Sequence, residues 1–435
     1  MAGAVGGLTL PDLPPEVLER VQPMLVDLFG VTLAGMRTPE LRRLVESWHC
    51  PPGDAPLIGD GRRSAPETTA MLSAIAACCL ELDEGNKYAA GHPAAHVVFA
   101  AIAAVRLRDR QVSGAAFLSA VVAGYEVAAR FGHATALDPG WHPHGHWGAT
   151  GAACAATMLL GGTTTQVAAA VDAATGLMQV TPWATVLDGS FTRNLWIGGA
   201  NRAGLDAARL AMSGLVQNTG AAWHSLGDLV GTLDPAVLVE GLGRDWLTAK
   251  GYAKQHSSCS YTHPAVDAVQ TLKSARAWTP DEVTRVRVVT HSLARPLLNR
   301  DPQNRLAAMF SLAFVVSVAV VNDVVDPAVM EPGSATFLAA QEFSARVEVE
   351  IDETLDAYLP RLRCADVTVE FADGGSLALS QPNPIGDADH FPLTAEDIDR
   401  KLTALIGAED VARIHAVVDS LAASDDACTA LDELP

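Results

Sequence analysis

Basic side chains are scarce in this chain of 435 residues. Its 30 Lys and Arg residues stand against 50 Asp and Glu residues, which gives a formal net charge of −20. A nucleic-acid surface needs clustered Lys and Arg, so the composition argues against nucleic acid as a partner. The same charge repels anionic ligands at long range, and a site for such a ligand must therefore carry its own cations.

Other patterns are also missing. The seven cysteines are irregularly spaced, and neither a C-x-x-C nor an H-E-x-x-H motif occurs, which predicts free thiols in a reducing compartment. The N-terminus lacks the basic start and apolar stretch of a signal peptide. The longest apolar run, residues 306–321, falls short of the ~20 residues that a membrane-spanning helix needs. These absences predict a cytoplasmic protein without a membrane segment.

Residues 81–96, ELDEGNKYAAGHPAAH, place many titratable groups between two apolar runs. The stretch includes the acids Glu81 and Asp83, then Lys87 and His92. Its two glycines interrupt helical structure and predict a loop, and the His-Pro dipeptide predicts the start of a new helix. Because a helix N-terminus attracts anions, we interpret this stretch as part of a site. A solvated loop capped by a histidine is the alternative.

Helical patterns dominate the first part of the chain. Apolar residues recur at helical spacing over residues 15–35, and a second helix is predicted over residues 39–48. Residues 68–214 are rich in Ala and helical in pattern. Small side chains let helices approach closely, so we predict a compact all-helical domain.

The pattern changes after about residue 278. Residues 283–291, 345–352 and 365–380 alternate apolar and polar side chains, as half-buried strands do, and the last of these contains a hairpin turn. One apolar helix is predicted over residues 306–321. The predicted fold is mainly α, with strands on one face of the smaller domain and helices on the other. Its parts are an all-helical domain (1–268), a smaller α+β lid domain (269–395) and C-terminal helices that return to the helical domain (396–435).

Three histidines alternate in the segment GWHPHGHWG: His142, His144 and His146. On an extended strand they would share one face, which is typical of metal ligands. Pro143 and Gly145 predict an irregular loop instead, so acid–base work or anion binding is favoured and no metal is predicted.

Two basic side chains stand among neutral residues. Arg193 precedes an apolar helix, where it is either an ordinary ion-pair partner or a bidentate clamp for a carboxylate. Lys254 begins KQHSSCSYTH, a segment that also contains Cys259 and two histidines and is unusually dense in reactive groups.

Four segments together resemble the MmgE/PrpD family. They are LPPEVLERVQPMLVDLFGVTLAG, LDEGNKYAAGHP, GYEVAARFGHATALDPGWHPHGHWGATGAA and KQHSSCSYTHPAVDA, in this order along the chain. The family contains 2-methylcitrate dehydratase, cis-aconitate decarboxylase and iminodisuccinate epimerase. The resemblance implies a helical domain with a lid domain, usually a homodimer, an active site between the domains, and neither a metal nor an organic cofactor.

The resemblance also implies roles for individual residues. His92 and His142 match the histidines of two family motifs, and we predict that they are the acid–base groups. Glu81 begins the acidic segment, and it or Asp83 would orient an imidazole. The predicted substrate-binding residues are Arg193, Lys254, Lys87, His144, His146 and Cys259.

Several positions depart from the family pattern. Arg193 replaces a lysine, so a group that could donate a proton becomes one that stays charged. Phe314 replaces a tyrosine in the apolar helix, and Gly85 replaces a threonine after the acidic run. These changes indicate a pocket altered from the common ones.

The predicted function is that of a cofactor-independent lyase, a dehydratase or decarboxylase, acting on a small polycarboxylic acid. An epimerase of a small dicarboxylate is an alternative, because the same groups placed on opposite faces of one carbon would invert it. A non-catalytic binding protein on the same fold is the second alternative.

Overall fold

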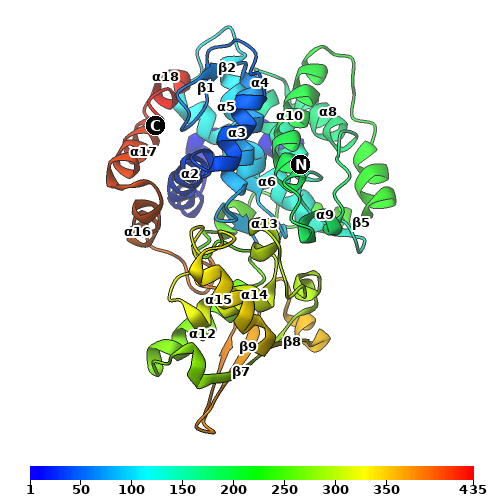
Figure 1. The fold of residues 1–435 in the computed structure, drawn as a ribbon. Helices are drawn as coiled ribbons and strands as arrows, with labels where there is room; N and C mark the ends of the chain where they lie inside the picture. The colour runs from blue at the N-terminus through cyan, green and yellow to red at the C-terminus, as the bar shows by residue number, and fades with distance from the viewer.

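Two hydrophobic cores organise the structure, a computed structural model that describes residues 1–435. The larger core gathers side chains between Val5 and Leu233 together with the C-terminal stretch Ile398 to Leu431. The smaller core is built mainly from Cys259 to Phe371. The chain is 55% helical and 10% strand, which confirms a mainly α fold. Figure 1 shows the sheet-bearing part below the helical part.

The helical domain is a bundle of long, apolar helices. Helices α5, α6, α7 and α10 pack on one another, and α4 packs against α5 and α10. The main helices are α2 (Pro15–Met36), α3 (Pro39–Ser47), α4 (Pro66–Cys78), α5 (Pro93–Arg106), α6 (Gly114–Ala134), α7 (Gly148–Leu159), α8 (Thr164–Thr175) and α10 (Thr192–Met212). The predicted helices over residues 15–35 and 39–48 are thus confirmed.

Helix α6 is long and apolar enough to cross a membrane, but 89% of its apolar window is buried inside the bundle. Burial on all sides is itself a sufficient reason for its composition. The short helices α1 (Ala2–Val5), α9 (Trp183–Leu187) and α11 (Pro235–Val239) lie between or before the longer ones.

A four-stranded sheet with the order β10-β9-β7-β8 forms the smaller domain. Its strands are β7 (Val283–Thr290), β8 (Val347–Ile351), β9 (Ala365–Phe371) and β10 (Ser376–Gln381). Strands β7 and β8 are parallel, and the other pairs are antiparallel. Helices α12 (His263–Ala275) and α14 (Leu312–Val321) contact the sheet. The three predicted strand regions and the hairpin are confirmed.

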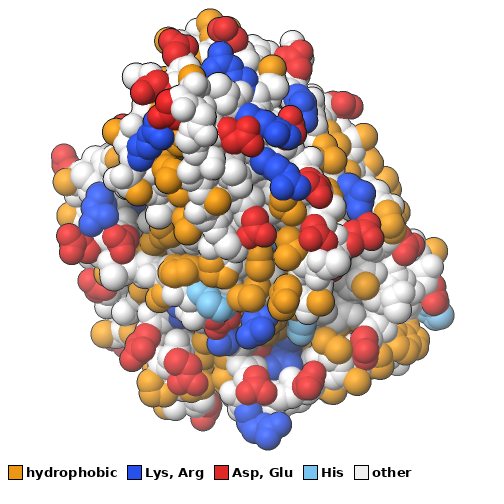
Figure 2. All heavy atoms as spheres, turned by 90° about the horizontal axis from the view of Figure 1, so that it is seen from below, with side chains coloured by type: hydrophobic (Ala, Val, Ile, Leu, Met, Phe, Trp, Pro, Cys, Tyr) orange, Lys and Arg blue, Asp and Glu red, His pale blue; other side chains and the backbone are white.

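The polar face of the sheet carries exposed ion pairs, such as Arg285 with Glu348 and Arg287 with Glu350. Figure 2 views the molecule from the side of this domain and shows acidic and basic side chains interspersed. On that face they form no continuous basic patch.

Two boundaries differ from the predictions. The predicted domain boundary after residue 268 falls inside α12, whose buried side chains belong to the smaller core. The predicted single helix over residues 306–321 is two helices, α13 (Arg305–Met309) and α14. Ser311 lies at the break, where its hydroxyl caps α14 by accepting from the amide of Phe314. Phe310 therefore lies at a bend.

The C-terminal helices pack on the helical domain. They are α16 (Ala395–Ile406), α17 (Ala408–Leu421) and α18 (Ala427–Leu431). Helices α16 and α17 pack against α2, and α18 packs against α5. Thr394 and Asp397 form a capping box at the start of α16, and the remaining helix, α15 (Ala335–Phe343), packs on α14.

Candidate functional site

A small cavity lies where the two cores meet. The helical domain contributes Glu81, Gly91, His92, His142, His144 and Arg193 to its walls. The other walls include Trp183, Tyr252, Cys259, Ser260, Tyr261 and Phe310. Its free volume is about 30 Å³, which is room for about one or two water molecules. A six-carbon acid needs more space, so binding one requires the walls to move apart.

The acidic run is buried, which excludes the interpretation of residues 81–91 as a solvated loop. Residues 80–87 are all buried, and the short strand β3 (Gly85–Asn86) pairs with β6 (Gly251–Tyr252). Glu81 has a φ of 54°, an uncommon left-handed conformation for a residue other than glycine. Such strain at a buried position often accompanies a functional site.

The start of α5 at Pro93 is confirmed, and its N-terminus is already occupied by an acid of the chain itself. The amide of Ala94 donates to Glu84 Oε2 at 3.0 Å, and the Tyr125 hydroxyl donates to the other oxygen of Glu84. Burial raises the pKa of Glu84 to about 8. This helix start is therefore satisfied by Glu84 and is not free for a ligand.

Four buried charges form a compact cluster beside the cavity. Glu81 receives Arg193 Nη2 on one oxygen and Lys254 Nζ on the other, the latter at 3.0 Å. Lys254 also lies 3.7 Å from Asp83. Burial opposes the charge of Lys254, but Glu81 and Asp83 hold its pKa above the usual value. The cluster thus contains two cations and two carboxylates, whose formal charges balance.

Hydrogen bonds set the tautomer of His92. Its Nδ1 lies 2.6 Å from the carbonyl oxygen of Glu84 and 3.2 Å from Asp83 Oδ2. Because the carbonyl oxygen of Glu84 can only accept, Nδ1 carries the proton. Nε2 has no partner in the protein, so in a neutral ring it is the basic nitrogen. The sequence predicts that Glu81 or Asp83 orients an imidazole. Of the two, Asp83 lies beside His92, whereas Glu81 contacts the two cations.

His142 has the opposite tautomer. Its Nδ1 accepts from the backbone amide of His144 at 3.2 Å, so the proton of a neutral His142 is on Nε2. The His144 ring stands between the rings of His92 and His142, with centroids 4.7 and 4.3 Å away. His146 turns from the cavity and bonds the Gln179 carbonyl at 3.1 Å.

The histidine loop is irregular, as Pro143 and Gly145 predict, and its three rings do not converge. No group of three or more His, Cys, Asp or Glu side chains is arranged to hold a metal ion. Gly148 follows this loop and makes room for a neighbouring ring, because a Cβ there would lie 2.2 Å from His96 Cδ2.

Burial lowers the pKa of all three cavity-facing histidines well below the ordinary value. Nearby cations add to the effect, Lys254 for His92 and Arg193 for His142 and His144. The three imidazoles are therefore neutral at pH 7. An anion bound beside them would favour their protonation.

Aromatic side chains make much of the remaining wall. Trp183 lies 4.5 Å from the ring of His142, and the Arg193 guanidinium lies 5.4 Å from the Phe310 ring. Cys259 is buried, and burial raises the pKa of its thiol to about 11, so the thiol is neutral. Phe314 does not line the cavity but packs on Phe337 in the smaller core. The expectation that Phe314 alters the pocket is therefore not met.

Lys87 also lies outside the cavity. Its ammonium binds Asp387 and Asp389 at 2.9 Å each, in the segment that joins β10 to α16. A role for Lys87 in contacting the substrate does not match this placement, because its side chain does not line the cavity. The sequence did not predict five of the residues that line the cavity, because aromatic and hydroxyl side chains in loops form no pattern that indicates a site. These residues are Trp183, Tyr252, Ser260, Tyr261 and Phe310.

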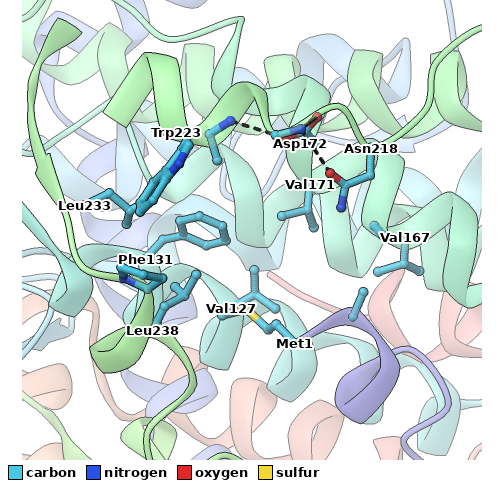
Figure 3. Close-up of a pocket in the computed structure, with 15 residues that line it drawn as sticks. Met1, Val127, Phe131, Val167, Val171, Asp172, Asn218, Trp223, Leu233 and Leu238 are labelled. Carbon is cyan, nitrogen blue, oxygen red and sulfur yellow. Dashed lines mark hydrogen bonds between the residues drawn. The ribbon is translucent and has the colours of Figure 1, made fainter. Parts of the chain in front are cut away.

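A larger pocket of about 290 Å³ lies within the helical domain (Figure 3). Its walls are mostly apolar, with Phe131, Trp223 and Leu233 among them. Its one acidic side chain, Asp172, accepts hydrogen bonds from the amides of Thr219, Gly220 and Ala222. This pocket therefore offers no free acid–base group.

This sequence is similar to known proteins over almost its whole length. Residues 1–223 match the MmgE/PrpD N-terminal domain, and residues 256–422 match the MmgE/PrpD C-terminal domain. Cis-aconitate decarboxylase of Aspergillus terreus is 26% identical, covering 95% of this chain and 90% of the relative. The cis-aconitate decarboxylase-like protein oryM of Aspergillus oryzae is 27% identical, covering 95% and 92%. Human cis-aconitate decarboxylase is 24% identical, covering 93% and 86%.

Proposed function

Because the chain belongs to the MmgE/PrpD family, whose cis-aconitate decarboxylases are its relatives, we propose that it is a cofactor-independent decarboxylase of a small, unsaturated polycarboxylic acid. The observation that carries this proposal is the position of His92. Its ring lies between the carboxylate of Asp83 and a closed, partly aromatic cavity.

Substrate carboxylates would bind on the side of Arg193 and Lys254. A guanidinium can hold a carboxylate with two parallel hydrogen bonds, which fixes orientation as well as position. Nη2 of Arg193 points at Glu81, whereas its Nε has no acceptor in the protein. The neutral His142 would donate from Nε2 to a further carboxylate oxygen.

The departing carboxylate would lie against the aromatic wall of Trp183 and Phe310. An apolar surface disfavours a carboxylate more than it disfavours neutral CO₂, so placing the group there favours its loss. In that step the carbon–carbon bond breaks, CO₂ leaves, and the electron pair moves into the remaining conjugated carboxylate. Arg193 and Lys254 stabilise the charge that develops there.

The carbon must then receive a proton. His92 is the best-placed donor, because Asp83 beside Nδ1 stabilises the imidazolium while Nε2 has no competing partner in the protein. The proton leaves Nε2 and forms the new carbon–hydrogen bond, and His92 returns to the neutral tautomer of the empty site. Such positioned proton transfer contributes roughly 10²–10⁴-fold to the rate.

Dehydration is a close alternative on the same residues. His92 Nε2 would then remove a proton from carbon, and the donor at His142 Nε2 would protonate the leaving hydroxyl. Epimerisation needs two bases on opposite faces of one carbon. His142 has a protonated Nε2 in the neutral state and so is poorly suited to be the second base, which favours a lyase.

Proton NMR in D₂O with cis-aconitate, citrate, 2-methylcitrate and iminodisuccinate tests the proposal. We expect cis-aconitate, or an acid of similar structure, to be consumed with new vinyl signals, and His92→Asn to lower kcat by about 10²–10⁴-fold. The control is His415→Asn, which removes a half-exposed histidine paired with Asp399 at 2.7 Å. Binding without turnover of any acid would favour the non-catalytic alternative, and deuterium exchange without a new product would favour an epimerase.

We also propose that the chain acts as a cytoplasmic homodimer. Residues 177–239 contain several large apolar side chains at the surface, including Val180 at 75%, Leu215 at 79% and Leu229 at 71% exposure, and a second copy would cover them. All seven cysteines are free, which suits a reducing compartment. Light scattering on the purified chain tests the dimer, because a monomeric mass would contradict it.

A further inference from the structure

Arg363 is a buried arginine with an unusual set of partners. It lies in the segment before β9, is only 2% exposed, and extends from the smaller domain toward the helical one. Its Nη2 donates to the carbonyl oxygen of Lys87 at 2.7 Å, and its Nη1 lies 3.4 Å from Ser260 Oγ. Its Nε has no acceptor. The guanidinium lies 5.1 Å from the ring of Tyr261.

No carboxylate pairs with Arg363, although every other buried basic side chain has one. Arg130 pairs with Glu126, Lys87 pairs with Asp387, and Arg193 and Lys254 share Glu81. Taking a charge out of water costs several kcal/mol unless a counter-ion or good hydrogen bonds compensate. Arg363 has two acceptors and five N–H groups, so its charge is poorly compensated.

The balance of charge around the cavity makes Arg363 important for binding a polyanion. The formal charges of Arg193, Lys254, Glu81 and Asp83 balance, and the three imidazoles at the cavity are neutral. A polyanion that entered would therefore find no excess positive charge among these groups. Arg363 supplies one positive charge beside Ser260 and Tyr261, which line the cavity.

We propose that Arg363 is the specificity-determining cation for a substrate carboxylate bound beside Ser260. This carboxylate rests against Ser260, whose hydroxyl is oriented by Arg363, and the guanidinium provides its counter-charge. Arg363 acts partly through Ser260 and is a positioning residue. It makes the site select a tricarboxylate over a dicarboxylate. This inference rests on the proposed function, since it names the substrate class of the same site.

A structural role is the competing explanation, because Arg363 also bonds the Lys87 carbonyl across the domains. Arg346 provides a matched control in the same domain. It donates to the carbonyl oxygens of Pro280 and Val283, lies 5.2 Å from the Phe343 ring and pairs with no carboxylate. Arg346 differs in being exposed and in contacting no residue that lines the cavity.

Calorimetric titration of the full-length protein tests the inference with two unreactive probes, tricarballylate as the tricarboxylate and glutarate as the dicarboxylate. We expect Arg363→Met to weaken tricarballylate binding by about 10- to 100-fold, as for loss of a hydrogen bond to a charged group, and to change glutarate binding little. Arg363→Lys should recover part of the affinity, and Arg346→Met should change neither probe.

An unchanged preference for tricarballylate in Arg363→Met overturns the inference. An equal loss of affinity for both probes, with no recovery in Arg363→Lys, also overturns it, because that result indicates a structural role. If Arg363→Met does not fold, Ser260→Ala should weaken tricarballylate binding selectively, and an equal effect on both probes overturns the inference. If the wild-type protein binds neither probe and turns over no polycarboxylate, the proposed function fails first.

Discussion

The charge cluster around Glu81 leads to a prediction that can be worked out in magnitude. Glu81→Gln keeps the length and shape of the side chain but removes its charge. Arg193 and Lys254 would then face only Asp83, which lies 3.7 Å from Lys254. Because all four groups are buried, water cannot replace the missing carboxylate.

Breaking a buried ion pair by removing one partner costs about 3–5 kcal/mol. For a domain of 150–250 residues, 1 kcal/mol shifts Tm by about 2–4 °C. We therefore expect Glu81→Gln to lower the Tm of the helical domain by about 6–20 °C. The variant also leaves an excess positive charge in the cavity, so a tricarboxylate should raise its Tm by more than it raises that of the wild type.

Thermal unfolding followed by circular dichroism measures both the loss of Tm and its increase on ligand binding, when it is recorded with and without about 10 mM tricarballylate. The control is Glu67→Gln, which breaks a surface pair with Arg209 whose side chains are 24% and 53% exposed. Surface pairs contribute about 0–1 kcal/mol, so the control should change Tm by a few degrees at most. A Tm for Glu81→Gln equal to that of Glu67→Gln would refute the view of Glu81 as the counter-ion of two buried cations.

Three further outcomes are expected. Stability should fall as the pH drops from about 6.5 toward 4, because burial lowers the pKa of His96 and His146 to about 4. Each histidine contributes up to about 3 kcal/mol to the free energy of unfolding, and this contribution is fully present above pH 6.5. An unfolding free energy that does not change over this range would contradict the lowered pKa values. Gly148→Ala should destabilise the protein by at least about 1–3 kcal/mol through its contact with His96, measured by urea unfolding, and a neutral effect would show that the ring can move. Lys87→Met should lower stability by about 1–3 kcal/mol, since it removes the ammonium from buried Asp387, which keeps His390 and two backbone amides as partners. It should leave KM unchanged below its Tm, and a KM raised tenfold would return Lys87 to the substrate site.

Periodicity and composition determined much of the architecture. The alternation in residues 283–291, 345–352 and 365–380 follows from a sheet with one buried and one solvated face. Capping by Thr394 and the proline at position 93 are local effects that depend on a few neighbouring residues. The resemblance in four ordered segments identified the family, and it directed attention to His92, His142, Arg193 and Lys254, which lie together at the cavity or beside it.

Only the tertiary structure decided how these groups are paired and charged. Lys87 is six residues from Glu81 in the sequence, yet its partners come from residues 387–389, and sequence spacing carries no information on contacts of that range. The tautomers of His92 and His142 depend on carbonyl and amide groups placed by folding. Their lowered pKa values result from burial between two domains, and the unpaired charge of Arg363 becomes visible only when every neighbouring carboxylate has been assigned a partner.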